Sequence, residues 1–255
     1  MSLLRTEKLK KHFGETRAVD GVDFTVNEGE FLSLVGTNGA GKTTLVNLIS
    51  AFLLPDSGRI FIGDRDITHA SVDERIRSGI ARSFQLVNLF DDLSVLDNVA
   101  LSIFAREGKT KRIFALADRD AAVAQEASGL LEQFGIGGKA QAAARDLAQG
   151  ERKLLDVAIA YALRPKLLFL DEPTSGVSTR EKAPIMDIVS AIVRAGGITV
   201  VIIEHDMDIV FRYSERIVVM HQGSILADGS PDDIRRNDEV TTTLIGTHVT
   251  GESAY

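Results

Sequence analysis

The chain contains no cysteine, and its apolar runs, such as residues 198–203, span only a few positions. The lack of cysteine excludes a disulfide framework and thiolate metal sites, and it suits a reducing compartment. The apolar runs fall far short of the roughly 20 residues that a membrane-spanning helix needs. The N-terminal stretch 1–14 is too polar for a signal peptide. We therefore expect a chain that does not cross a membrane itself, so that any transport role requires a membrane-spanning partner.

An excess of basic residues is also missing. Lys and Arg total 29 against 36 Asp and Glu, which gives a net charge of -7, and the basic residues are scattered. A protein that binds nucleic acid through phosphates needs a clustered positive surface, so we expect no nucleic-acid partner. The apolar fraction of 44% and the charged fraction of 25% are typical of a globular protein with a sizeable core.

Hydrophobic patterning predicts an α/β fold that is interrupted by helices. Residues 3–9 and 19–26 alternate in polarity, and 31–35 form a short apolar run, which indicates strands. Helix formers dominate from about 86 to 163. Alternating strands and helices then resume, with strands expected at 167–170, 198–203, 217–220 and 224–227.

This order predicts a single domain at 1–246 with a helical subdomain inserted at about 86–163. The cap Ser230 and the proline Pro231 open a last helix, and a polar tail follows at 247–255.

A glycine-rich stretch separates the strand 31–35 from a helix that is expected to begin at Lys42. It satisfies the pattern G-x-x-x-x-G-K-[ST], in which glycines let successive backbone N–H groups converge on phosphates. The helix N-terminus adds partial positive charge, Lys42 reaches the β- and γ-phosphates, and the Thr43 hydroxyl ligates Mg²⁺. The predicted nucleotide-binding residues of this loop are Gly36, Asn38, Gly39, Ala40, Gly41, Lys42, Thr43 and Thr44.

Two later strands also end in polar side chains. The apolar run 167–170 is followed by Asp171 and Glu172, and beside a phosphate-binding loop Asp171 is expected to hold Mg²⁺. Glu172 is the candidate for orienting the attacking water. His205 follows the strand 198–203 and is the candidate γ-phosphate sensor. No pair of histidines has metal-ligand spacing, so Mg²⁺ is the one metal we predict.

The order and spacing of these motifs resemble the ATP-binding subunits of ABC transporters over nearly the whole chain. Gln85, in the segment 83–85, resembles the glutamine of the family's Q-loop, which implies contact with Mg²⁺ or water. The segment 147–151 resembles the signature sequence, so Ala148, Gln149 and Gly150 are expected to contact the γ-phosphate that the other subunit holds. Phe13 resembles the aromatic residue that stacks on adenine.

The resemblance implies a P-loop NTPase core with an antiparallel β subdomain and an inserted α-helical subdomain. Its cofactors are ATP and Mg²⁺. The implied catalytic residues are Glu172, His205, Gln85 and Lys42, and the implied metal ligands are Thr43, Gln85 and Asp171.

Four positions depart from the family pattern. Ala148 and Gln149 replace the usual Ser and Gly of the signature, so a hydroxyl contact to phosphate is missing while backbone N–H groups remain. Ser178 replaces the aspartate of the D-loop, and Thr37 stands where proline is common. None of these changes removes a residue that is expected to perform hydrolysis.

Within the family, the segments 79–85, 203–207 and 226–231 look most like the ATPases of prokaryotic branched-chain amino acid importers. The resemblance implies an identical or sister ATPase subunit in a head-to-tail dimer, membrane-spanning permease subunits and a periplasmic or extracellular substrate-binding protein. It places the chain at the cytoplasmic face of the membrane.

Other functions share parts of this pattern. The ATPase of lipopolysaccharide export has a similar ending, although the stretch between Gln85 and Leu147 is long for it. A soluble ABC-type ATPase acting on ribosomes or DNA is expected to show two cassettes, a long coiled coil or a basic face, and the sequence shows none of these. A GTP-binding switch is expected to carry an Asn-Lys-x-Asp motif, which the sequence lacks. A small-molecule kinase would leave the signature segment unexplained.

Overall fold

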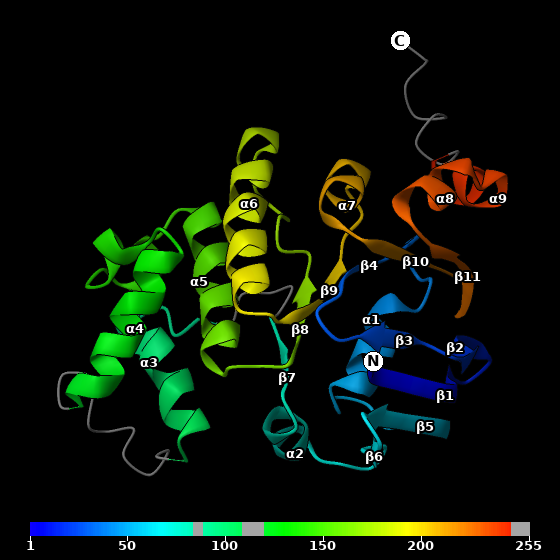
Figure 1. Cartoon of the computed structure of the whole chain (residues 1–255), viewed down its shortest axis with the longest axis horizontal. Helices are drawn as coiled ribbons and strands as arrows, with labels where there is room; N and C mark the ends of the chain where they lie inside the picture. Colours follow the sequence, from blue (N-terminus) through cyan, green and yellow to red (C-terminus); the bar gives the residue numbers. More distant parts are fainter. Residues whose placement is uncertain (84–88, 109–119, 246–255) are drawn as a thin grey trace. The chain divides into compact units, whose positions relative to one another are not determined.

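A computed structural model describes residues 1–83, 89–108 and 120–245, and the chain divides into two compact units (Figure 1). Unit 1 combines Met1–Arg75 with the chain from Thr199 onward, and unit 2 is the continuous stretch Ile76–Ile198. The chain leaves unit 1 within helix α2 (Val72–Arg77). Unit 2 is therefore an insertion into the sequence of unit 1.

The antiparallel sheet of unit 1 is organised around the long strand β1 (Ser2–Phe13). This strand pairs with β2 (Thr16–Val22), β3 (Thr25–Asn27) and β5 (Ser57–Ile62), and β5 pairs in turn with β6 (Arg65–Asp66). The expected strand 19–26 is split in two. Asp23, in the gap between the two strands, accepts the N–H of Lys8 of β1 with its carboxylate at 2.7 Å, and Lys8 has φ 47°.

The second sheet of unit 1 is mostly parallel. Strand β4 (Phe31–Gly36) lies between the parallel strands β10 (Arg216–His221) and β9 (Thr199–Ile203), and β11 (Ser224–Gly229) pairs antiparallel with β10. Strands β4 and β9 are buried almost throughout, as their continuous apolar runs predict.

The helices of unit 1 are α1 (Lys42–Ile49), α7 (Met207–Tyr213), α8 (Pro231–Arg236) and α9 (Asp238–Val240), with a π-helical segment at Thr241–Ile245. Buried side chains of β10, α7, α8 and α9 share one core cluster with Val35 of β4. The predicted last helix begins as expected, because the Ser230 hydroxyl caps the backbone N–H of Asp233. The helix ends after six residues, at Arg236. The side chain of the next residue, Asn237, caps the short helix that follows.

Unit 2 joins a two-stranded parallel pair to a group of helices. Strand β7 (Ile80–Arg82) pairs with β8 (Leu167–Asp171). Helix α3 (Val95–Arg106) packs on α4 (Ala121–Gln133) and α5 (Gln149–Ala162), and α5 packs on α6 (Thr179–Ala195). Short 3-10 turns lie at Gly137–Lys139 and Ala144–Asp146. The rings of Phe134 and Tyr161 meet edge to face at 5.8 Å and support the contact of α4 with α5.

The predicted fold class is confirmed: an antiparallel sheet, a mostly parallel sheet and a group of helices occur in one α/β chain. The compact unit 2 is wider than the helical insertion expected at 86–163, since it also contains β7, β8 and α6. Among the described residues, no helix combines the length and the apolar character needed to cross a membrane.

Candidate active site

The glycine-rich loop of unit 1 connects β4 to α1, as its sequence predicts. Lys42 is the first residue of α1, and its ammonium folds back over the loop, donating to the carbonyls of Gly36 at 2.7 Å and Thr37 at 3.0 Å. Gly41 caps the helix with φ 102°, a conformation that favours glycine. No acidic side chain lies in the first turn and no side chain caps it, so the geometry suits an anion at the N-terminus of α1.

Two glycines of the loop have no room for a side chain. A Cβ on Gly36 would lie 2.2 Å from the carbonyl oxygen of Met220, and a Cβ on Gly41 would lie 2.1 Å from that of Ala18. The loop is thus held between β2 and β10. The Gly223 N–H also donates to the Ala40 carbonyl at 3.0 Å, which fixes the loop from a third side.

The remaining loop positions differ in exposure. Asn38, Gly39 and Thr43 are exposed, Thr44 is half-buried, and the methyl group of Ala40 is buried. Ala40 can therefore offer a ligand only its backbone, whereas Thr43 is an exposed residue.

The far end of α1 is anchored by a buried arginine that the sequence analysis did not single out. The Arg75 guanidinium donates to the carbonyls of Leu48 and Ile49 at the end of the helix and to that of Thr68 at 2.9 Å. Burial lowers the pKa of Arg75 to about 10. A cation at this end complements the helix dipole and fixes the helix that carries Lys42.

His205 and the glycine-rich loop share one edge of the parallel sheet. Strand β9 runs parallel to β4 with Leu34 opposite Ile203, so both strands end at the same edge. His205 is exposed there. The preceding Glu204 is 1% exposed and accepts the His205 backbone N–H at 3.2 Å, which fixes the turn that presents the histidine. No sequence motif marks Glu204 as functional.

Phe13 ends β1 in the same unit. The residue is 50% exposed, and the Lys11 ammonium lies over its ring, 5.7 Å from the ring centre. Stacking of Phe13 on adenine stays a prediction.

Unit 2 holds the two carboxylates at the end of β8. Asp171 is 3% exposed, and its carboxylate oxygen Oδ2 accepts from the Arg82 guanidinium of β7 at 2.6 Å. The Asp171 N–H donates to the Ser83 hydroxyl at 3.3 Å. No role is predicted for Arg82 and Ser83, because nothing in the sequence pairs them with Asp171, which lies 89 and 88 positions further along the chain.

Glu172 follows at φ 47°, an uncommon conformation for a residue other than glycine. Its side chain is half-buried. The left-handed residue directly follows β8, so Glu172 lies outside the strand that carries Asp171. Backbone outliers of this kind cluster at functional sites.

The predicted signature segment forms the start of α5. Ala148 is its N-cap and supplies no side-chain cap; instead the Glu151 carboxylate accepts the Ala148 N–H at 2.9 Å. Ala148 and Gln149 are exposed, and Gly150 lies close to Ile185, to whose Cδ1 a Cβ would come within 3.1 Å. Ser178 is the N-cap of α6 and its hydroxyl donates to Glu181.

Gln85, predicted as a catalytic residue and metal ligand, lies outside the described residues. Of the other predicted metal ligands, Thr43 offers a hydroxyl, and Asp171 offers a carboxylate whose Oδ1 is not engaged by Arg82. These hard oxygen donors fit Mg²⁺, which protein sites hold through few side chains together with substrate phosphates. The described residues contain no cluster of three His, Cys, Asp or Glu suited to a metal ion.

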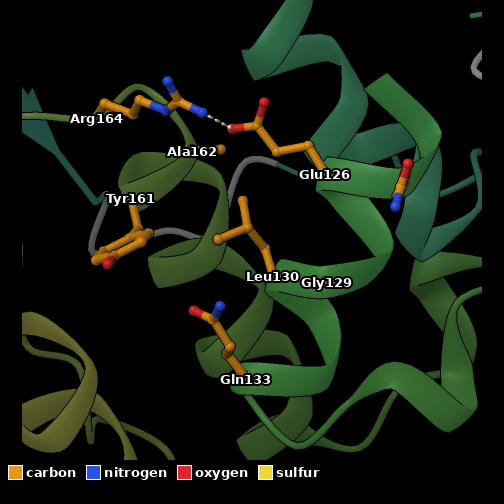
Figure 2. A pocket seen from close by; sticks show the side chains of 8 residues that line it. Glu126, Gly129, Leu130, Gln133, Tyr161, Ala162 and Arg164 are labelled. Atoms are coloured by element: carbon orange, nitrogen blue, oxygen red, sulfur yellow. Dashed lines mark hydrogen bonds and ion pairs between the residues drawn. The ribbon is translucent and has the colours of Figure 1, made fainter. Parts of the chain in front are cut away.

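A cavity of about 360 Å³ lies in unit 2 between α4 and the end of α5, and none of the residues that line it is a predicted site residue (Figure 2). Figure 2 shows the Arg164 guanidinium bound to Glu126 of α4, a hydrogen bond of 2.9 Å. Arg106 of α3 also donates to Glu126, at 2.7 Å. These hydrogen bonds, that from Arg106 above all, hold the pKa of Glu126 below its usual value.

Comparison with known proteins gives a consistent result. A profile described as ABC transporter matches residues 19–175, more than half of the chain. A probable branched-chain amino acid transport ATP-binding protein of Methanocaldococcus jannaschii is 34% identical over 240 residues, which cover 93% of each chain.

Solved structures agree. An ATP-binding cassette of an ABC transporter in its ADP conformation has a TM-score of 0.83 at 32% identity, covering 96% of this chain and 99% of that one. A dimeric cassette bound to ADP and Pi in a post-hydrolysis state has a TM-score of 0.77 at 25% identity, covering 89% of this chain and 98% of that one. With the matched profile and the curated relative, these likenesses show that the chain belongs to the ABC transporter family and is an ATP-binding, ATP-hydrolysing cassette.

Proposed function

We propose that this chain is the ATPase subunit of an importer for branched-chain or other apolar amino acids. The observation that carries the ATPase function is the loop between β4 and α1, where Gly36 and Gly41 admit no side chain and Lys42 lies over the open N-terminus of the helix. The amino acid substrate rests on the relative named for branched-chain amino acid transport, because no residue described above selects a transported molecule.

In this proposal the loop N–H groups and the Lys42 ammonium bind the nucleotide phosphates, and Phe13 stacks on the adenine. Glu172 accepts a proton from the attacking water and orients it, while His205 contacts the γ-phosphate. Ammonium and backbone N–H groups stabilise the charge that develops on the transferred phosphoryl group.

Thr43 and Asp171, with Gln85, would hold Mg²⁺. When bound, Mg²⁺ supplies positive charge that neutralises the phosphates. The Arg82 guanidinium holds the Asp171 carboxylate in place through Oδ2 and leaves Oδ1 for this role.

The proposed partners follow the family. A second ATPase subunit, identical or sister, would contribute its segment equivalent to Ala148–Gly150 to each bound ATP, in line with the dimeric cassette to which this chain is similar. Membrane-spanning permease subunits and an external substrate-binding protein would complete the importer. The ATPase would then act at the cytoplasmic face of the membrane.

The lipopolysaccharide-type exporter is the weaker alternative, because the curated relative carries an amino acid transport name. Deleting the gene should impair uptake of leucine, isoleucine and valine. Normal uptake combined with a defective outer membrane would favour the exporter.

The catalytic assignment is tested with three variants of the full chain. Lys42→Ala should lose nucleotide affinity, because a charge-assisted hydrogen bond of about 1.5–3 kcal/mol to phosphate disappears. Glu172→Gln should keep affinity, lose phosphate release and accumulate as an ATP-bound dimer in size-exclusion chromatography. Adding Ala148→Ser should lower the ATP concentration at which that dimer forms. Turnover by Glu172→Gln at the native rate would show that another residue orients the water.

A further inference from the structure

Helix α5 carries a buried lysine in direct contact with the turn that presents Glu172. Lys153 is 2% exposed, and its ammonium donates to the Glu172 carbonyl at 3.1 Å and to the Ser175 hydroxyl at 2.9 Å. The same carbonyl accepts the Ser175 N–H at 3.0 Å and closes the turn. The Lys153 ammonium thus binds both ends of the turn 172–175.

The turn contains a glutamate in a backbone conformation that is uncommon for residues other than glycine. Glu172 has φ 47°, which places a side-chain-bearing residue in the left-handed region. Such a residue keeps this conformation only where its surroundings fix it. A buried ammonium on its own carbonyl, together with the turn hydrogen bond, supplies that constraint.

A second contact joins the same helix face to the same turn. Gln149 lies four residues before Lys153, one helical turn away on the same side of α5. A Cβ on Gly176 would come within 3.2 Å of the Gln149 Nε2 atom, so the two are in close approach. The start of α5 and the turn 172–176 are therefore packed as one body.

We propose that Lys153 is a positioning residue for Glu172. Its ammonium holds the Glu172 carbonyl, and through it the left-handed backbone that aims the carboxylate. Because α5 begins at the predicted signature segment, this contact also ties that segment to the residue that orients water. The inference rests on the proposed role of Glu172 and extends it to a residue that acts through the Glu172 backbone.

The test is steady-state ATP hydrolysis by the full chain. Lys153→Met roughly keeps the length of the side chain and removes its hydrogen-bond donors. We expect kcat to fall about tenfold or more, where a factor of ten corresponds to about 1.4 kcal/mol of activation free energy. KM should stay within about twofold of the native value. Lys153→Arg restores a donor and should recover most of the rate. In a Glu172→Gln background, Lys153→Met should have no further effect, because both changes act through one group.

Arg152→Met is the matched control. Arg152 precedes Lys153 on α5, but its guanidinium donates to the Ala144 carbonyl at 2.9 Å and pairs with Asp91 at 2.8 Å, away from the turn. It should leave kcat and KM unchanged. A Lys153→Met protein with native kcat, or with the same change as Arg152→Met, would overturn the proposal.

If Lys153→Met does not fold, Ser175→Ala decides the question, because it removes one of the two acceptors and leaves the lysine. It should lower kcat by about two- to fivefold at unchanged KM. A native rate in this variant contradicts the inference. Suppose that the native protein hydrolyses ATP, that Glu172→Gln does not, and that the Lys153 and Ser175 variants behave as native protein. This result refutes the positioning role alone. If the native protein does not hydrolyse ATP, the proposed function is refuted as well.

Discussion

Replacing Arg82 with methionine should cost more stability than replacing any exposed arginine. The Arg82 and Asp171 side chains are 9% and 3% exposed, and their atoms Nη2 and Oδ2 lie 2.6 Å apart. Removing one member of a buried ion pair leaves an uncompensated charge, at a cost of about 3–5 kcal/mol. At about 2–4 °C per kcal/mol for domains of this size, Tm should fall by roughly 6–20 °C.

The loss should come from the isolated carboxylate rather than from the missing guanidinium. A double variant, Arg82→Met with Asp171→Leu, removes both charges and should recover at least about half of the lost stability. Arg145→Met is the control, because Arg145 pairs with Asp92 at 2.6 Å while 62% and 87% of the two side chains are exposed. Exposed pairs contribute about 0–1 kcal/mol.

Circular dichroism during thermal and urea unfolding suits this measurement, since the chain has no tryptophan. Two compact units can unfold in separate transitions, so the comparison applies to the transition that Arg82→Met shifts. A loss under about 1 kcal/mol, or a double variant as unstable as the single one, would refute the argument that Asp171 is a buried charge held by Arg82.

Two further changes test other parts of unit 2. Glu126→Gln should lower Tm by an amount that stays constant at neutral pH and shrinks as pH falls below the ordinary carboxyl pKa of 4.5. The reason is that the Arg106 hydrogen bond depresses the pKa of Glu126 in the folded state, and protonation of the carboxylate removes that stabilisation. A Tm difference that persists at low pH would contradict the charge argument. Pro184→Ala should raise Tm, since Pro184 lies inside α6 and is exposed there. A proline inside a helix costs about 3 kcal/mol, and the alanine variant loses part of this gain because its unfolded chain is freer. An unchanged Tm in thermal unfolding would show that α6 tolerates the proline ring.

The sequence by itself determined the local features. The glycine-rich loop between β4 and α1 could be predicted because its pattern consists of residues that are neighbours in the sequence. Few backbone conformations place those residues around a phosphate, so the pattern is specific. The buried strands β4, β8 and β9 follow in the same way from continuous apolar runs. The Ser230 cap is likewise a local pattern, and the structure confirms it.

Only the tertiary structure decided which distant side chains support these local features. Strand pairing places Arg82 against Asp171, 89 positions away, and helix packing places Lys153 against Glu172, 19 positions away. The tertiary structure also explains why position 36 requires glycine, because the carbonyl that excludes a side chain there belongs to Met220. Periodicity and spacing report the geometry of one segment, whereas these contacts depend on how several buried segments pack together, and no short sequence pattern encodes that packing.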